Sequence, residues 1–388
     1  MSIISIIGRR PALPSLLKAL LWVAVASLAA ACSDDTTVLP GLDTDTPAAD
    51  DACKLYITLR FQEPQTRAAD NNVWDGAYAS DAGTRLDNYI DPESVRLTIY
   101  NNVGGNYQLL GTVKPDVIPG PTISDYMFVA QMADLLDLNL KNLTEENPVI
   151  FRLKVVMTAN TTPAASIGDT RYNISSLDTD LTLTDLADAT GIPMMGVSEA
   201  EISFPNRLVA DNAIEIYMLR AVAKTEINLS DGLYDDGYRF VSATISQDFN
   251  TAGMVMPLRW SDVNDTRKLT HIGDTFNPLA SAVTTGGRSM TAINDKQLVA
   301  YLPETTCANR RRPLSITLNY MTPNGIQRST TLYMADYNAN GTVISNTGHD
   351  VVRNHLYYFN ISGGTDTYRV SYSVCPWTER TSGDINFN

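Results

Sequence analysis

The chain has 388 residues, of which 29 are basic and 43 acidic, and its formal net charge is −14. This acidity argues against nucleic acid and anionic lipid as partners, since both would repel the protein. Apolar residues make up 44% of the chain, which is ordinary globular usage, and single cores stop growing near about 250–300 residues. The length therefore predicts two domains.

The chain begins with a segment typical of export. After basic residues within the first 18 positions, an apolar run extends from Ala19 to Ala31 and is interrupted only by Ser27. A membrane-spanning helix needs about 20 apolar residues, whereas a secretory signal needs about 7–15. The stretch Leu28-Ala29-Ala30-Ala31-Cys32 resembles the lipobox of bacterial lipoproteins. The resemblance implies a signal peptide at 1–31 and acylation, such as palmitate, on Cys32. The alternative is an ordinary secretory signal in which Cys32 has no role.

Residues 32–52 are rich in Asp, Thr, Pro and Ala and lack any apolar period, so we expect a flexible tether. Its start, Ser33-Asp34-Asp35, is similar to the acidic signal that directs some Bacteroidia lipoproteins to the outer face of the outer membrane. The alternative is a polar linker. Beyond Cys32 the chain has three more cysteines, which excludes a disulfide scaffold. A Cys307–Cys375 bridge and three buried thiols both remain open.

The first core element is predicted at Lys54 to Phe61, where apolar and polar side chains alternate as in a half-buried strand. Its apolar face consists of Leu55, Ile57, Leu59 and Phe61. A hairpin follows, with its turn at Gly104-Gly105. Phe151 to Met157 predicts another strand. Helical spacing of apolar residues predicts short helices at Met127 to Leu138 and at Leu183 to Ala189.

After Pro205-Asn206 the apolar pattern resumes as one long strand at Ile214 to Leu229. The remaining predicted strands are Tyr238 to Ile245, Leu298 to Leu302, Leu314 to Tyr320, Thr330 to Met334, Leu356 to Ile361 and Tyr368 to Val374. Many short strands with turn signals every 8–12 residues predict an all-β protein of β-sandwich domains with few helices. We expect an N-terminal domain at 53–210 and a C-terminal domain at 211–388.

Residues that would carry enzyme chemistry do not form a recognisable pattern. The three histidines, His271, His349 and His355, lack metal spacing. Gly196-Val197-Ser198 begins like a nucleophile elbow, but Ala200 stands where the closing glycine belongs. Asp336-x-Asn338-x-Asn340-Gly341 matches half of a calcium loop, yet its twelfth position is Thr347 rather than a bidentate glutamate. We expect no catalysis, cofactor or metal.

Several phrases, in this order over most of residues 53–388, resemble the fimbrillin superfamily, the subunits of type V pili of Bacteroidia. They are Val149–Leu153 through Thr158-Ala159-Asn160, Ile192–Gly196, Leu219–Ile227, Tyr301–Glu304, Val352–Tyr357 and Val374–Trp377 followed by Asp384-Ile385. The resemblance implies two β-sandwich domains like that of transthyretin. It also implies assembly by strand exchange, in which a groove left open in one subunit receives a strand from another.

In that family, stalk subunits lose their first strand when an arginine-specific protease cuts after it, whereas anchor subunits keep both strand and lipid. Here Lys54–Phe61 is the candidate first strand, and Arg67, followed by Ala68, is the candidate cleavage site. The expected partners are other fimbrial subunits and the outer membrane, which the lipid would enter. The resemblance leaves stalk, tip and anchor roles open. Two competing hypotheses are a surface glycan-binding lipoprotein and an exported hydrolase.

Overall fold

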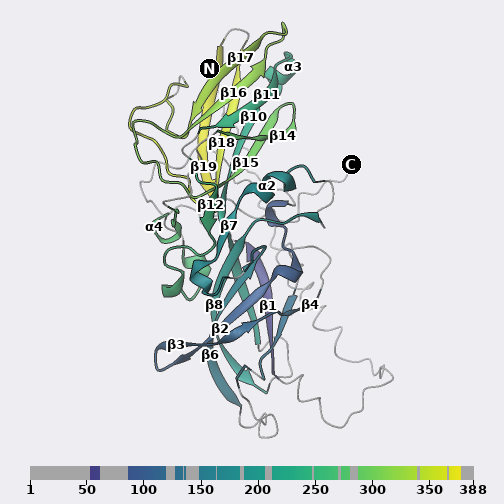
Figure 1. The fold of residues 1–388 in the computed structure, drawn as a ribbon, viewed down its shortest axis with the longest axis vertical. Helices are drawn as coiled ribbons and strands as arrows, with labels where there is room; N and C mark the ends of the chain where they lie inside the picture. The colour runs from purple at the N-terminus through teal and green to yellow at the C-terminus, as the bar shows by residue number, and fades with distance from the viewer. Residues whose placement is uncertain are drawn as a thin grey trace, which may run out of the picture. The chain divides into compact units, whose positions relative to one another are not determined.

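A computed structural model describes residues 53–376, with gaps at 62–85, 119–126, 134, 137–147, 163, 184–187, 206–211, 247–248, 270–271, 280–286, 339–340 and 365–366. Strands dominate these residues and the helices are short, which confirms the all-β prediction. Figure 1 shows the strands of two sheet groups, the first coloured purple to teal and the second teal to yellow. In the described residues, no helix is both long and apolar enough to span a membrane.

The first sheet group is one eight-stranded sheet in the order β3-β2-β6-β8-β9-β1-β5-β4. The strands are β1 (Lys54–Phe61), β2 (Arg96–Val103), β3 (Asn106–Val113), β4 (Asp116–Ile118), β5 (Met127–Gln131), β6 (Val149–Ala159), β8 (Met194–Phe204) and β9 (Ala213–Arg220). Its inward side chains share one core, which includes Leu97, Phe128 and Met157. The hairpin predicted at Gly104-Gly105 joins β2 and β3, and both glycines have the positive φ that such a turn requires.

The second sheet group consists of two sheets that enclose one core. A five-stranded sheet has the order β14-β15-β10-β18-β19, and a four-stranded sheet has the order β13-β11-β16-β17. The strands are β10 (Val222–Leu229), β11 (Arg239–Ile245), β13 (Arg288–Ser289), β14 (Thr291–Asn294), β15 (Gln297–Pro303), β16 (Ser315–Met321), β17 (Gln327–Tyr333), β18 (His355–Gly364) and β19 (Thr367–Pro376). This pair of sheets is a β-sandwich.

A connecting segment of the second group, residues 249–277, returns to the first group, and we call it the strap. It contains β12 (Ala252–Met254), η9 (Trp260–Asp262), η10 (Thr266–Lys268) and α4 (Ile272–Thr275). β12 pairs with β7 (Arg171–Asn173), and the Lys154 ammonium of β6 donates to the Ser261 carbonyl at 2.6 Å. Val255, Met256 and Leu269 of the strap belong to the first core. The strap therefore covers apolar surface that β6 and β8 would otherwise expose.

The remaining elements are short helices of three to six residues. They are η2 (Leu86–Asn88), η3 (Pro92–Ser94), η6 (Ile167–Asp169), α2 (Ser175–Asp180) and α3 (Asp231–Asp235). Cys53 and Cys307 are free, buried thiols, so no Cys307–Cys375 bridge is formed.

Two predicted elements are wrong. The segment predicted as a helix at Met127 to Leu138 begins with strand β5, because an antiparallel partner in β1 takes its backbone hydrogen bonds. The long strand predicted at Ile214 to Leu229 is two strands, β9 and β10, which bend apart at Ala221 and enter different sheets. Alternation has the same period in both sheets, so it does not mark the division. Most of the helix predicted at Leu183 to Ala189 lies outside the described residues.

The change of sheet also bears on the predicted domain division at residue 210. Strand β9 pairs with β1 and β8, so the first group extends to Arg220 and the second begins at Val222. By its contacts, the chain from Ala48 to Asn388 is a single compact unit. Two separately folding domains within it remain a prediction.

A glycine in the middle of the first sheet yields a first test. Gly196 of β8 lies beside Met157 of β6 and Met218 of β9, and a Cβ there would stand 2.8 Å from the Tyr217 carbonyl oxygen and 2.9 Å from the Met218 sulfur. We expect Gly196→Ala to lower the free energy of unfolding by about 1–3 kcal/mol, since the sheet must shift to admit the methyl group. Urea denaturation measures the change.

The matched control is Gly232→Ala in α3, where a Cβ meets nothing within 4 Å. It should leave the unfolding midpoint unchanged or raise it slightly, because alanine is the better helix former. Equal midpoints for the two variants would contradict the packing described for β8.

Candidate functional site

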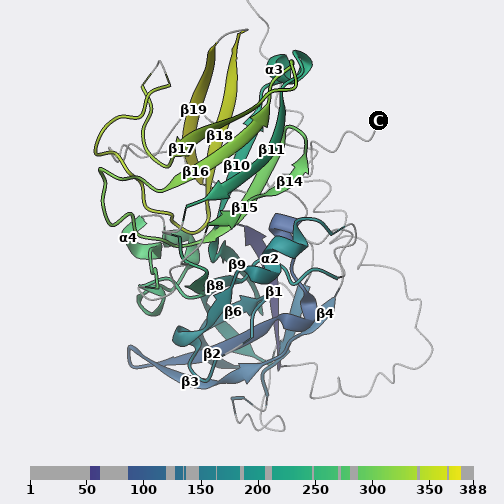
Figure 2. The same ribbon diagram turned by 45° about the horizontal axis from the view of Figure 1, so that its top comes forward.

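The strand predicted as the first core element lies inside the first sheet rather than at its margin (Figure 2). β1 pairs in parallel with β9, from Tyr56 opposite Ala213 to Phe61 opposite Met218. On its other side β1 pairs antiparallel with β5. The contact continues past β5, where the Met132 amide donates to the Cys53 carbonyl at 2.8 Å. Loss of β1 would therefore unpair backbone groups on two neighbouring strands at once.

The two faces of β1 are as different as its alternating sequence predicts. Leu55, Ile57, Leu59 and Phe61 are at most 2% exposed and belong to the first core. On the other face Arg60 is exposed, and its guanidinium lies 3.4 Å from the Glu215 carboxylate of β9. Each buried apolar side chain contributes about 1.5–3 kcal/mol. The inner face is thus an apolar strip that the rest of the core requires.

The last residue of β1 meets a buried charge. Phe61 lies opposite Met218, and β9 continues to Arg220, the next residue on the same face. Because β1 ends there, the Arg220 side chain can fold over its end, and the guanidinium carbon lies 4.8 Å from the centre of the Phe61 ring. Arg220 is 0% exposed. A guanidinium removed from water gains from the negative face of an aromatic ring.

Two segments far apart in the chain, η2 and the residue that precedes β18, supply the polar partners of Arg220. Its Nε donates to the Asp87 carbonyl at 2.8 Å and one terminal nitrogen to Asn354 Oδ1 at 3.1 Å, while the other donates to the side chain of Asn88. Asn354 has a φ of 54°, the left-handed conformation that asparagine tolerates better than most residues. Its own amide donates to the Val222 carbonyl at 2.8 Å. Arg220 thereby joins η2, β9 and the start of β18.

A second buried charge lies next to the first. The Lys224 ammonium of β10 contacts the Asp87 carboxylate at 3.0 Å and that of Glu226 at 3.5 Å, and the Lys224 and Asp87 side chains are at most 3% exposed. The Tyr301 hydroxyl of β15 donates to Asp87 at 2.5 Å. Burial, reinforced by the negative charge of Asp87, holds the pKa of Tyr301 well above its usual value. The phenol therefore stays a donor, and Asp87 of the first group is bound by two side chains of the second.

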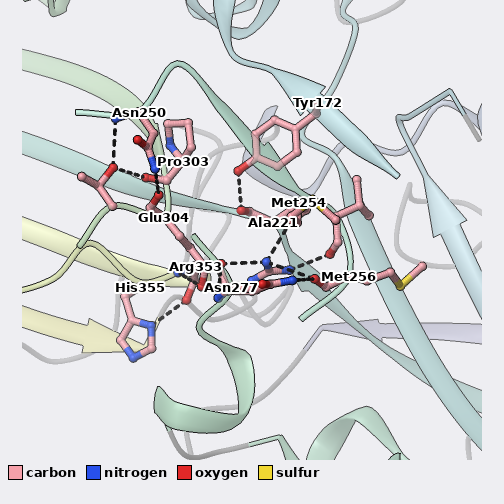
Figure 3. Close-up of polar contacts among 12 residues, drawn as sticks. Tyr172, Ala221, Asn250, Met254, Met256, Asn277, Pro303, Glu304, Arg353 and His355 are labelled. Atoms are coloured by element: carbon pink, nitrogen blue, oxygen red, sulfur yellow. Dashed lines mark hydrogen bonds and ion pairs between the residues drawn. The ribbon is translucent and has the colours of Figure 1, made fainter. Parts of the chain in front are cut away.

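A third buried charge, the Arg353 guanidinium, holds the strap in place (Figure 3). The Arg353 guanidinium pairs with Glu304 at 2.7 Å, and both side chains are at most 2% exposed. The same guanidinium donates to the carbonyls of Val255 at 2.6 Å and Met254 at 2.9 Å. The Glu304 carboxylate also accepts from the Asn277 backbone amide at 2.9 Å. One ion pair thus holds both ends of the strap against β15 and β18.

Sequence reasoning did not predict these three charges as a site. The sequence did indicate buried charge near the first two, because Arg220, Lys224 and Glu226 stand within the apolar run that predicts one long strand. Charged residues are rarely fully buried unless they are paired. Of the other predicted site residues, Cys32, Arg67 and Ala68 lie outside the described residues.

The other motifs do not gather into a catalytic or metal site in the described part of the chain. Gly196-Val197-Ser198 lies within strand β8 rather than at a strand-to-helix turn. In the half-matched calcium loop, Asp336 contacts His349 Nε2 at 3.1 Å, and Asn338 accepts from the Thr342 amide at 3.0 Å. No group of three His, Cys, Asp or Glu side chains is arranged to bind a metal ion in this part of the chain.

Comparison with known proteins gave similarity at the level of structure only. No family model matches the chain, and no curated protein does. The chain is similar to the tip fimbrial protein Mfa3 from Porphyromonas gingivalis, with 12% identity and a TM-score of 0.44, over 84% of this chain and 100% of that one. It is also similar to a fimbrial assembly protein from Parabacteroides distasonis, with 10% identity and a TM-score of 0.39, over 82% of this chain and 98% of that one. These values are too low to transfer a function.

The buried pair at Asp87 gives a second test. We expect Lys224→Met to lower the free energy of unfolding by about 3–5 kcal/mol, because it leaves the Asp87 carboxylate buried beside Tyr301 without its ammonium partner. Thermal and urea unfolding measure the loss. Adding Asp87→Asn to Lys224→Met should recover part of it, since the orphaned charge is then gone. A double variant as unstable as the sum of the two single variants would show that the two charges do not interact.

Proposed function

We propose that this chain is a structural, non-enzymatic subunit of a cell-surface fimbrium, exported as a lipoprotein and assembled by exchange of the strand at the β1 position. The observation that carries the proposal is the place of β1. It is the first described strand, it lies between two other strands of its sheet, and its inner face belongs to the first core. An element with these properties can be replaced only by another strand of the same pattern.

The order of features along the chain supports the same function. Cys32, the proposed lipidated residue, precedes the tether, the tether precedes β1, and the proposed cleavage site Arg67 follows β1. A cut after Arg67 would separate the body of the protein from β1 and the lipid together. The uncut chain would stay attached to the outer membrane with β1 in place. The cut chain would then serve as a stalk subunit and the uncut chain as an anchor subunit.

A surface glycan-binding lipoprotein would require an exposed aromatic platform. Among the tryptophans, Trp74 and Trp377 lie outside the described residues, and Trp260 of the strap packs against the first core. Binding of the purified chain to surface polysaccharide would favour this second function.

Cleavage gives a third test. If the chain is a stalk subunit, Arg67→Ala should leave an intact monomer that does not enter filaments, because β1 then stays in its own sheet. Mass spectrometry of sheared filaments should find a uniform terminus at Ala68 in the unmutated chain. Arg96→Ala is a control that removes an arginine from a described strand without touching the proposed site.

The two roles differ in what the same experiment finds. Peptides that span Arg67 in every polymerised copy would exclude the stalk role. If the chain is an anchor, Arg67→Ala should assemble as the unmutated chain does, and β1 should persist in surface preparations.

Lipid attachment gives a fourth test. Acylation requires the Cys32 thiol, so Cys32→Ser should leave the protein unprocessed or released from the membrane. Membrane fractionation with and without detergent, and metabolic labelling with palmitate, measure the result. Cys53→Ser serves as the control, since that thiol is buried in the first core. A mature, detergent-requiring Cys32→Ser protein would contradict the lipoprotein proposal.

A further inference from the structure

The end of β1 and the start of the next described segment are held by the same side chain. The chain leaves β1 at Phe61 and is next described at η2, Leu86–Asn88. Arg220 lies over the ring of Phe61 and donates to the backbone of Asp87 and the side chain of Asn88. The stretch between them, 62–85, contains Arg67. A cut there would leave η2 joined to the rest of the protein and would separate Phe61 from it.

The contact of Arg220 with η2 would remain, because η2 is held by further bonds. Asp87 is bound through its carboxylate by Lys224 at 3.0 Å and by Tyr301 at 2.5 Å, both from the second sheet group. Loss of β1 therefore would not release η2. Of the Arg220 contacts described above, loss of β1 would remove the one with the Phe61 ring. The Arg220 guanidinium would then face the position that the ring had filled.

We propose that Arg220 makes the junction between the two sheet groups depend on the strand at the β1 position, and that any strand taking this position must bring an aromatic side chain to the place of Phe61. This inference rests on the proposed strand exchange and names a property of the partner. A leucine would fill part of the space but has no negative ring face for the cation. An aromatic ring supplies both.

The coupling to the junction follows from the remaining partners. Arg220 also binds Asn354 Oδ1, and the Asn354 amide bonds to Val222, the first residue of β10. Asn354 follows Arg353, whose ion pair with Glu304 holds the strap. An Arg220 side chain without its aromatic cover would turn toward water, and its contacts at Asn354 and Asp87 would weaken together.

The proposal describes the partner by chemistry rather than by name. The incoming strand needs apolar side chains at the places of Leu55, Ile57 and Leu59 and an aromatic one at the Arg220 end. This pattern holds for either strand direction, since the aromatic position is defined by Arg220 and not by the order of the chain.

The first arm of the test uses the intact chain. Hydrogen exchange is measured by mass spectrometry for peptides that contain Arg220 and Asn354, and for β16 and β17 as a distant reference. We expect Phe61→Leu to accelerate exchange at the two junction peptides about tenfold, with the reference unchanged. The control Ile57→Val trims an equally buried side chain of β1 that is not the one stacked on Arg220, and it should not act selectively at the junction. Equal junction exchange in Phe61→Leu and Ile57→Val would overturn the coupling.

The second arm tests the partner. A full-length chain with a site-specific protease sequence replacing residues 66–71 is cut, separated in denaturant from its released N-terminal piece, and refolded with peptides copying residues 54–61 that end in phenylalanine or in leucine. We expect native mass spectrometry to show about tenfold tighter capture of the phenylalanine peptide. Equal capture would overturn the aromatic requirement while leaving strand exchange intact. Capture of neither peptide would contradict strand exchange itself, and the first arm would still decide the role of Arg220.

Discussion

The described structure depends on one buried guanidinium. Arg220 has no exposure to solvent, so every one of its contacts must come from the protein itself. Those contacts come from β1 through the Phe61 ring, from η2 through Asp87 and Asn88, and from the second sheet group through Asn354. A charge in this position is stable only when all of these segments are in place. It therefore links β1, the first described strand, to the point where the chain passes from one sheet group to the other.

The covalent link between the two sheet groups is only Ala221, yet the chain from Ala48 onward is a single compact unit. This is because each sheet group also contributes a segment that packs against the other group. The first group sends η2 to Lys224 and Tyr301, and the second sends the strap to β6 and β8. The Arg353–Glu304 pair fixes the strap where it begins and ends. Buried pairs of this kind add little net stability over apolar packing, but losing one partner leaves an uncompensated buried charge.

A fimbrial subunit must carry tension between its neighbours and must not expose its core before assembly. The proposed order of lipid, tether, β1 and cleavage site would meet the second need, because β1 would fill the groove until cleavage. The segments η2 and the strap would meet the first need in the proposed role, because they join the two sheet groups through buried side chains in addition to Ala221. Both requirements involve the end of β1, where Phe61 contacts Arg220.

The sequence by itself determined the strands whose burial is one-sided. Alternation at Lys54 to Phe61 defined β1 and its inner face, and Gly104-Gly105 defined the first hairpin, because a period of two and a turn needing positive φ are local properties. Only the tertiary structure decided that Ile214 to Leu229 divides at Ala221, that Met127 begins a strand, and that Phe61 meets Arg220. The Asp87 and Asn354 partners of Arg220 lie 133 and 134 residues away from it along the chain, in opposite directions. No local pattern encodes such contacts, since they arise when distant segments are brought together to compensate a charge that folding removes from water.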